Sequence, residues 1–550
     1  MAARVQRLAL LWIVFGLLAA PGRAQDRPTK GMVWTPPPSL PRAERALRAM
    51  HARGVQAVRT PLVRDERLLA VADTLGLQWY QDLPLAYLAA PALADTIDYA
   101  REQLNRVLAV AQRHPSARHF GLARLSDTSD PAACSVLQQL AAVVQRQGPP
   151  GSQTYYVTPF TTADRCGAAV DQVLLDVRNA ARPAQRLQAW QRAHPETPVG
   201  LGALGTWVRR DTVRGLRAPH SPEAQARYLE RHLGSLLADT LQAPLASVFI
   251  YRWRDAADPS SDPYGRPYGV HAADGTPRPA AGVVEGFFTS TQTVFAFTAG
   301  QQPAAAAPWL VVMGWALIGL MALVYYRGPR FQQMVMRYFS AHNFYQESVR
   351  EGREVLVGSM LVLVVGELAG IAALGAVLGR CFQNAQPVLE AMQALPAPVH
   401  AVGAALMDQP ALLGLALAGG YGLSLLVWMG GLMGVGRYGT SLSAGQVLML
   451  VGGPRWPLLL VMVTALALSS LAPETGRSLV LWLLASTGGL MLWMTGRTVA
   501  DFIAVTRVPV VLAVIPVLIS PLFTVFWTGG LLIARYDVPV TFIGHLLTRT

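Results

Sequence analysis

The stretch VQAVRTPLVRDERLLAVADTLGLQWYQDLPL, residues 55–85, contains two β-rich runs separated by a helical segment. The runs occupy residues 54–61 and 76–84. Between them, DERLLAVADTLG places its apolar residues at helical spacing and ends in glycine just before the next run, which is a common way for a helix to stop. This β–α–β order predicts parallel strands joined by a crossover helix.

The same alternation recurs along the first half of the chain. Eight β-rich runs occupy residues 31–37, 54–61, 76–84, 119–127, 154–160, 171–178, 198–205 and 246–255. Most are followed by a helix-like segment, and eight such units in about 250 residues match a (β/α)8 barrel. We therefore predict an α/β fold, a TIM barrel, over residues 25–298. A doubly wound open sheet is the alternative, but no GxGxxG follows the first run.

The first residues, 1–24, predict a secretory signal peptide that is not part of the fold. A basic start at Arg4 and Arg7 precedes an apolar stretch at residues 8–20, and the small residue Ala24 stands before the expected cleavage point. An uncleaved anchor is the alternative. In both cases the segment that follows is exported.

Arginine dominates the charge of the chain. The formal net charge is +13, the isoelectric point is about 10.0, and lysine is nearly absent. Such a charge is typical of proteins that bind nucleic acid or anionic lipid. We exclude nucleic acid as a partner because the arginines are scattered and the first half of the chain is exported. The arginine- and alanine-rich, lysine-poor composition indicates a bacterial genome of high GC content.

Three cysteines are present. An oxidising compartment permits a disulfide between Cys134 and Cys166, and two unpaired buried thiols are the alternative. Cys381 flanks an apolar run of the second half. The sequence has no CxxC or HExxH motif, so it predicts no metal site and no cofactor.

In TIM barrels the active site lies at the carboxyl ends of the strands. The residues that end the eight runs are therefore the candidates for chemistry or binding. They are Trp34, Arg59, Asp82, Asp127, Tyr156, Asp176, Ala203, Trp253 and Asp255.

The segment 55–85 resembles the second and third strands of glycoside hydrolase family 2 and of the related clan of retaining glycosidases. That family has an arginine in the second strand, an Asp-x-x-Gly helix end and an acidic residue that closes the third strand. The matching positions are Arg59, Asp73, Gly76 and Asp82. Further segments resemble later parts of the family in the same order: 113–127, 248–255 and 268–281. The resemblance covers residues 31–290 and implies a glycosidase-like barrel that recognises carbohydrate.

Both catalytic positions that the resemblance implies are altered. Retaining glycosidases use two carboxyl groups about 5 Å apart, one as acid/base and one as nucleophile. The acid/base glutamate of the fourth strand is matched by Asp127, which is shorter by one methylene. The nucleophile of the seventh strand is matched by Ala203, in PVGLGALG at residues 198–205. A methyl group cannot attack an anomeric carbon, so we expect the family's two-carboxylate mechanism to be lost.

A degenerate glycosidase that binds a glycan without turnover is the function we predict. Arg59 would bind sugar hydroxyl groups, and Asp255 is a further candidate contact. Aromatic rings would stack on the sugar, and the candidates are Trp34, Trp79, Tyr156 and Trp253. Structural alternatives stand beside these roles, because Arg59 could simply pair with Asp82 and Trp253 could be packing.

An active hydrolase is the alternative. Asp127 would be its acid/base, and the second carboxylate would come from another strand end, Asp82, Asp176 or Asp255. An inverting pair needs carboxyl groups about 6.5–9.5 Å apart, which opposite strand ends could supply. The structural alternative for Asp127 is an N-cap of the helix that begins near Pro131.

The second half of the chain predicts an all-α membrane domain over residues 309–550. A Pro/Ala linker at 299–308 precedes it. Six apolar runs are long enough, or nearly so, to span a bilayer, at residues 309–326, 355–379, 411–435, 457–472, 478–495 and 509–534. We therefore expect about six transmembrane helices, with the lipid bilayer and a membrane protein as further partners.

Orientation follows from the exported barrel. The first span then runs inward, and the loop 327–354 with its five arginines faces the cytoplasm, in agreement with the positive-inside rule. This predicts a bacterial inner-membrane protein with its N-terminal domain in the periplasm. Glu367 interrupts the second run and is a functional candidate or an interhelical hydrogen bond. A transporter or envelope-assembly component is thus a third function.

Overall fold

The computed structural model describes residues 28–209, 214–238, 245–256, 266–301, 309–353, 355–471 and 473–548. The contacts between residues divide the chain into two compact units. One holds the chain up to Ala304 together with His545–Thr550, and the other is Ala305–Gly544. The predicted signal peptide, residues 1–24, and most of the predicted linker, 299–308, lie outside the described residues. The limits 25–298 and 309–550 stay predictions.

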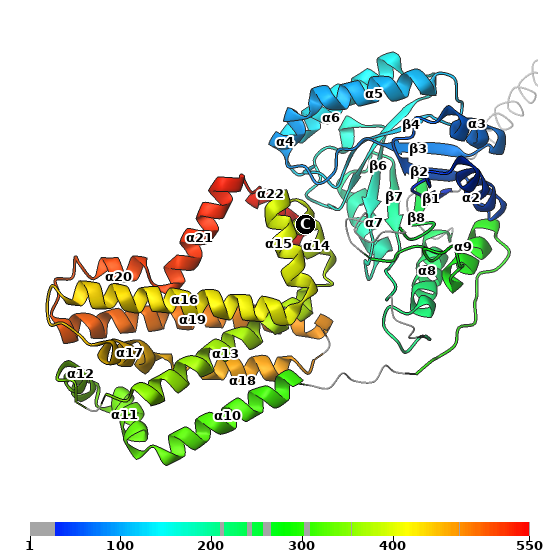
Figure 1. Cartoon of the computed structure of the whole chain (residues 1–550). Helices are drawn as coiled ribbons and strands as arrows, with labels where there is room; N and C mark the ends of the chain where they lie inside the picture. Colours follow the sequence, from blue (N-terminus) through cyan, green and yellow to red (C-terminus); the bar gives the residue numbers. More distant parts are fainter. Residues whose placement is uncertain are drawn as a thin grey trace, which may run out of the picture. The chain divides into compact units, whose positions relative to one another are not determined.

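The first unit is built on a closed barrel of eight parallel strands (Figure 1). Neighbouring strands follow the order of the chain, and β1 closes the barrel by pairing with β8. The strands are β1 (Thr29–Val33), β2 (Ala57–Pro61), β3 (Gln78–Asp82), β4 (His119–Arg124), β5 (Gln153–Thr158), β6 (Gln172–Asp176), β7 (Val199–Leu204) and β8 (Ser247–Tyr251). Each falls within one of the eight predicted runs or overlaps it. The predicted (β/α)8 fold is confirmed.

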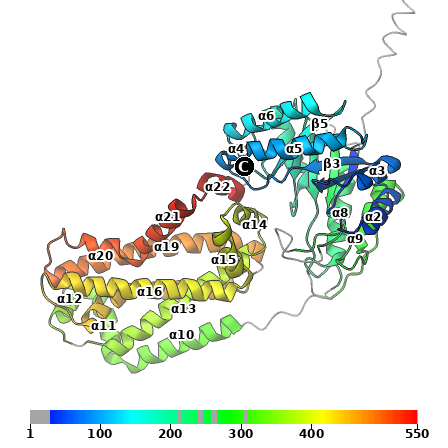
Figure 2. The same ribbon diagram turned by 45° about the horizontal axis from the view of Figure 1, so that its top comes forward.

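Helices surround the strands, with α5 and α6 lying together along one side of the barrel (Figure 2). The helices are α2 (Leu40–Ala52), α3 (Glu66–Leu75), α4 (Ala90–Asp95), α5 (Ile97–Ala111), α6 (Pro131–Gln147), α7 (Pro183–Ala193), α8 (Pro222–Leu236) and α9 (Pro279–Thr289). Each presents an apolar stripe to the outer face of the strands. One continuous core results, and among its fully buried members are Leu47, Leu69, Leu104, Leu137, Val58, Val173 and Leu201.

Local signals set the helix ends. Asp65 accepts a hydrogen bond from the backbone N–H of Arg67 and caps α3, which ends at Gly76 with φ 65°, a left-handed conformation that favours glycine. Helix α6 begins at Pro131 and is capped by Asp130, whose carboxylate accepts from the N–H of Ala132. The N-cap role considered for Asp127 is therefore wrong, because Asp130 occupies that position.

A disulfide joins Cys134 of α6 to Cys166, which stands just before the short 3-10 helix η1 (Gly167–Ala169). The Cα atoms of the two cysteines lie 4.8 Å apart. Of the two alternatives that the sequence left open, the structure has the bridge. Cys381 is a buried free thiol.

The second unit is entirely helical within the described residues. Its helices are α10 (Trp309–Arg327), α11 (Pro329–Ser340), α12 (His342–Arg350), α13 (Val357–Phe382), α14 (Gln386–Gln393), α15 (Ala397–Asp408), α16 (Pro410–Gly436), α17 (Ala444–Gly452), η3 (Gly453–Arg455), α18 (Leu458–Leu468), α19 (Pro473–Thr506), α20 (Val514–Leu518), α21 (Pro521–Tyr536) and α22 (Val540–Thr548). The predicted all-α character is confirmed.

Three helices are long and apolar enough to cross a membrane: Val357–Phe382, Pro410–Gly436 and Gly476–Thr506. Two bent pairs raise the number to five if each pair is one span. These are Ala444–Arg455 with Leu458–Leu468, bent by 51°, and Pro521–Tyr536 with Val540–Thr548, bent by 108°. The first predicted run corresponds to a shorter apolar helix, Gly314–Arg327.

One predicted span, 509–534, is not a continuous helix. The chain turns after Pro509, forms only the short α20, and starts α21 at Pro521. Proline lacks a backbone N–H and clashes with the preceding helical turn, so it tends to end helices or to begin them. Prolines at 509, 516 and 521 therefore break the run.

The predicted loop 327–354 forms two helices, α11 and α12. Five of its apolar or aromatic side chains are buried in the core of the helical unit: Phe331, Met334, Tyr338, Tyr345 and Val349. Phe339 and Phe344 are exposed. The buried side chains tie this segment to the other helices of its unit.

Candidate functional site

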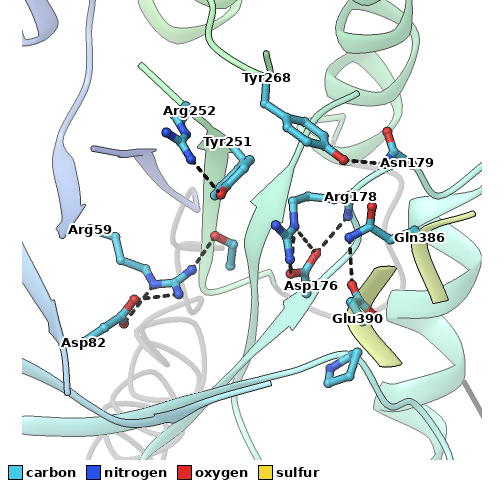
Figure 3. A network of polar contacts seen from close by, with 12 residues as sticks. Arg59, Asp82, Asp176, Arg178, Asn179, Tyr251, Arg252, Tyr268, Gln386 and Glu390 are labelled. Atoms are coloured by element: carbon cyan, nitrogen blue, oxygen red, sulfur yellow. Dashed lines mark hydrogen bonds and ion pairs between the residues drawn. The ribbon is translucent and has the colours of Figure 1, made fainter. Parts of the chain in front are cut away.

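Arg59 of β2 and Asp82 of β3 form a buried ion pair (Figure 3). The guanidinium Nε and Nη2 atoms donate to the two carboxylate oxygens at 3.0 and 2.7 Å. The Nη1 atom donates to the carbonyl oxygen of Gly202 in β7 at 2.7 Å. Because β2 and β7 are not neighbours, Arg59 spans the inside of the barrel. The ion pair considered as the structural alternative for Arg59 is present.

Tyr155 of β5 joins this pair by donating its hydroxyl to Oδ1 of Asp82 at 2.7 Å. Burial by itself would lower the pKa of Arg59, but the charge and hydrogen bonds of Asp82 outweigh it and raise that pKa above its ordinary value. Burial, followed by the charge of Asp82, raises the pKa of Tyr155 well above its usual range. At neutral pH Arg59 therefore stays charged and Tyr155 stays a neutral donor.

Asp176, the last residue of β6, is held by Arg178 two residues later (Figure 3). The Nε atom of Arg178 lies 3.0 and 2.9 Å from the two carboxylate oxygens, and Nη2 donates to Oδ2 at 2.5 Å. The backbone N–H of Arg178 also donates to Oδ1 at 3.0 Å. Both side chains are less than 5% exposed. Both carboxylate oxygens of Asp176 are therefore bound by Arg178.

Ala203 of β7 is the register partner of Asp176. Its carbonyl oxygen accepts a hydrogen bond from the N–H of Val177, and it is 3% exposed. The structure therefore places Ala203 at the carboxyl ends of the strands, which we call the barrel mouth. Beside it stands a carboxylate that is already paired with arginine.

An aromatic and cationic group lies beside this pair (Figure 3). The guanidinium carbon of Arg178 lies 4.6 Å from the ring centre of Tyr251, and Arg252 donates to the Tyr251 hydroxyl at 3.2 Å. Asn179 donates to the Tyr268 hydroxyl at 2.6 Å. Burial raises the pKa of Tyr268 to about 12, so its phenol is neutral at physiological pH. The group comes from the ends of β6 and β8 and from the segment after β8.

Asp127 follows β4 and is 6% exposed. Its backbone N–H donates to the carbonyl oxygen of Leu88, and its Oδ1 accepts from the hydroxyl of Ser129 at 2.5 Å. No arginine pairs with Asp127 among the residues that the structure describes. In this respect it differs from the other two candidate catalytic carboxylates, Asp82 and Asp176.

All four predicted stacking residues, Trp34, Trp79, Tyr156 and Trp253, belong to the hydrophobic core instead of an open surface. Trp34 is 3% exposed and packs edge-on against Trp79, with 6.1 Å between ring centres. Tyr156 is fully buried and donates to Asp164 at 2.8 Å. Trp253 packs against His271, with ring centres 4.1 Å apart, and is 7% exposed. Strand side chains alternate, so Tyr155 points inward and its neighbour Tyr156 points outward.

Asp255 is tied into the segment that follows β8. Its Oδ2 pairs with Nη2 of Arg278 at 2.5 Å, and its Oδ1 accepts from the N–H of Gly269 at 2.6 Å. Its side chain is 9% exposed. These contacts give Asp255 a role in fixing the local backbone.

A cavity of about 580 Å³ lies at the opposite, amino-terminal ends of the strands. Tyr80 and His119 line it as a stacked pair, with ring centres 3.9 Å apart, together with Gln153 and Gln172. Burial lowers the pKa of His119 to about 4. In TIM barrels this end contributes to stability, whereas function belongs to the other end.

The parts of the chain that the structure describes contain no group of three or more His, Cys, Asp or Glu side chains that could hold a metal ion. The barrel mouth instead offers paired charges, phenols and one amide. Its chemistry is that of hydrogen bonding to a polar ligand.

The sequence reading missed several residues at this mouth: Tyr155, Arg178, Asn179, Tyr251, Arg252 and Tyr268. Two signals were available. DVRN at 176–179 continues directly from a strand end with an acid, a base and an amide. YRW at 251–253 ends the last strand, but only its tryptophan was singled out.

Comparison with known proteins gives structural likeness alone. No protein-family model matches the chain, and no curated protein matches it. A GH2 β-galacturonidase from Eisenbergiella tayi bound to galacturonate has a TM-score of 0.44 and 15% identity, over 49% of this chain and 52% of that one. A β-glucuronidase from Ruminococcus gnavus in complex with D-glucaro 1,5-lactone has a TM-score of 0.43 and 15% identity, over 48% and 49%. The chain spans about half the length of these structures.

Proposed function

We propose that this protein is a membrane-anchored carbohydrate-binding protein whose glycosidase-like barrel no longer hydrolyses its ligand. Its place would be the bacterial inner membrane, with the barrel in the periplasm and the helical unit as anchor. The helices long and apolar enough to span a bilayer support the anchor. The resemblance of residues 31–290 to glycoside hydrolase family 2 supports the ligand class.

The observation that carries this proposal is that Asp176, at the end of β6, and Ala203, in β7, are register partners on neighbouring strands. A retaining glycosidase needs a free carboxylate as nucleophile at this edge of the barrel. Here the matching residue offers a methyl group, and both oxygens of the adjacent Asp176 are bound by Arg178. Asp82 is occupied in the same way by Arg59 and Tyr155.

Binding itself would use the polar groups of the mouth. Asn179, which is partly exposed, would supply an amide to the ligand, and the buried Arg252, Tyr251 and Tyr268 would hold the surrounding polar groups in place. Ligand sites commonly combine aromatic walls with a few well-placed polar groups of this kind. The buried rings of Trp34, Tyr156 and Trp253 would pack in the core around the barrel and would not contact the sugar.

A hydrolase that uses Asp127 is the second candidate. The observation in its favour is that Asp127, in contrast to Asp82 and Asp176, is not paired with an arginine among the described residues. It accepts a hydrogen bond from Ser129 and lies close behind the end of β4. Asp127 would be the acid/base of such a hydrolase, and its partner carboxylate would have to leave an ion pair.

The test uses the full chain, purified in detergent micelles, against a panel of oligosaccharides and of aryl glycosides. We expect saturable binding of at least one glycan, no release of the aryl group, and weaker binding by Asn179→Gly, which removes the partly exposed amide and tolerates the left-handed backbone at that position. Turnover that is abolished by Asp127→Asn would establish the hydrolase instead. Absence of binding to every glycan would contradict both functions.

A further inference from the structure

Glu367 lies near the middle of α13, a 26-residue helix that is long and apolar enough to cross a membrane. Its side chain is 1% exposed. An ionisable group in such a helix is costly unless it is paired, and such groups commonly mark proton or ion sites. The proposed binding function of the barrel does not use this residue.

The two carboxylate oxygens of Glu367 differ in their surroundings. The hydroxyl of Tyr421 in α16 donates to Oε1, and Nε of Arg455 in η3 lies 3.2 Å from the same oxygen. Oε2 is buried and has no hydrogen-bond partner among the described residues. Buried polar atoms are almost always satisfied, so an unpartnered carboxylate oxygen requires an explanation. A proton on Oε2 would remove the negative charge and so lower the cost of burying that oxygen without a partner.

Arg455 stands at the break between two helices. It ends η3, which separates α17 from α18, and the apolar helices on the two sides meet at 51°. Its Nη1 donates to the carbonyl oxygen of Val451, and its guanidinium carbon lies 5.0 Å from the ring centre of Trp428. Broken helices at membrane depth are tolerated where they build a site, and transporters commonly place ion-coupling groups at such breaks.

The glycines on either side of Glu367 in α13 lie against apolar side chains. The adjacent Gly366 packs against Met321 of α10 and Leu459 of α18, and Gly370 packs against Met462 of α18. Among the described residues, Tyr421 and Arg455 are the titratable groups in contact with the carboxylate. The state of one ion pair therefore determines the charge of this region.

We propose that Glu367, Tyr421 and Arg455 form a proton-binding site that couples protonation to the geometry of the broken helix. A proton from the aqueous phase bonds to Oε2, which turns the carboxylate into a neutral carboxyl group. An O–H bond of a hydronium ion breaks as the new O–H bond forms, water is released, and no electrons are transferred. Arg455 then loses its counter-charge in an apolar region, which favours its movement away from Glu367. Because Arg455 ends η3, that movement changes the angle between α17 and α18.

The experiment is infrared difference spectroscopy of the full chain in liposomes between alkaline and acidic buffers. We expect a carboxylic C=O band at acidic pH that Glu367→Gln removes. The matched control is Asp501→Asn, because Asp501 is also a fully buried carboxylate of the helical unit and its Oδ2 has no hydrogen-bond partner among the described residues. The Glu367 band should survive in Asp501→Asn.

A second variant keeps the test valid if Glu367→Gln does not fold. Tyr421→Phe retains the carboxylate and loses only the hydroxyl, so the same band should persist at a shifted position. A band unchanged by either substitution, or absent from the wild-type spectrum, would overturn the proposal. A spectrum that responds to sodium in place of choline, and not to pH, would identify a metal cation as the ligand and would also overturn it.

Discussion

Asp176 at the end of β6 is the register partner of Ala203 in β7. Arg178, two residues further along, engages both oxygens of Asp176. The barrel edge where the resemblance to family 2 glycosidases implies a nucleophile thus holds a methyl group and a neutralised carboxylate. The proposal that the barrel binds a glycan without cleaving it rests on this relationship.

The Arg59–Asp82 pair should be a main determinant of barrel stability. Removing one member of a buried ion pair leaves an uncompensated charge and costs about 3–5 kcal/mol. We expect Arg59→Met to lower the free energy of unfolding by this amount in denaturant titrations followed by tryptophan fluorescence. Arg67→Met is the control, because the exposed pair Arg67–Asp65 is worth about 0–1 kcal/mol. Equal losses for the two variants would contradict this assignment.

The disulfide between Cys134 and Cys166 should stabilise the barrel by restricting the unfolded chain. The two cysteines are 32 positions apart, and a loop of this size contributes about 3–4 kcal/mol in the chain-entropy model. Cys134→Ser with Cys166→Ser should therefore unfold at lower denaturant concentration than wild type. Cys381→Ala, which leaves the bridge intact, serves as control. A wild-type sample in which both thiols react with an alkylating reagent would contradict the bridge.

His119 should make the barrel acid-sensitive. Burial lowers its folded-state pKa from 6.5 to about 4, so between these pH values the unfolded chain binds more protons than the folded one. Stability should therefore fall by up to about 3 kcal/mol as pH drops from 6.5 to 4. His119→Gln, which cannot titrate, should show a shallower decline over this window. Parallel curves for the two proteins would contradict the role of His119.

Restoring a glutamate at position 203 should not restore hydrolysis. Ala203→Glu would place a second carboxylate beside Asp176 in a region where Ala203 is 3% exposed, and like charges in such a site repel each other. We expect lower stability, judged by melting temperature, and no cleavage of aryl glycosides. Ala203→Gln, the uncharged match, should destabilise less. Turnover by the glutamate variant alone would show that the rest of the catalytic machinery has survived.

The barrel was predictable because its eight strands alternate with helices in one regular order, and parallel strands place their ends at one edge. Arg59, Asp82, Asp127 and Asp176 were found in this way. The side on which each residue points was less predictable. The register shifts between β4 and β5 and between β6 and β7, so simple counting along the strand loses the inward positions. Tyr156 was therefore selected where its neighbour Tyr155 faces the interior.

The sequence also could not show which side chains contact one another at the barrel mouth. Arg178 binds Asp176 because the chain turns directly after β6, and Tyr268 meets Asn179 although 89 positions separate them. Such contacts depend on loop conformation, which periodicity does not encode. In the helical unit, the sequence contains the prolines that break the run 509–534. The run was nevertheless predicted as one span, because hydrophobicity does not distinguish a continuous helix from a broken one.

The central claim is that the barrel binds a glycan and leaves it intact. Proton NMR of an oligosaccharide mixed with the full chain in detergent tests both parts in one sample. We expect the sugar resonances to broaden on addition of protein, less so with Asn179→Gly, and we expect no new anomeric signals on long incubation. New anomeric signals that disappear with Asp127→Asn would show hydrolysis and would contradict the account.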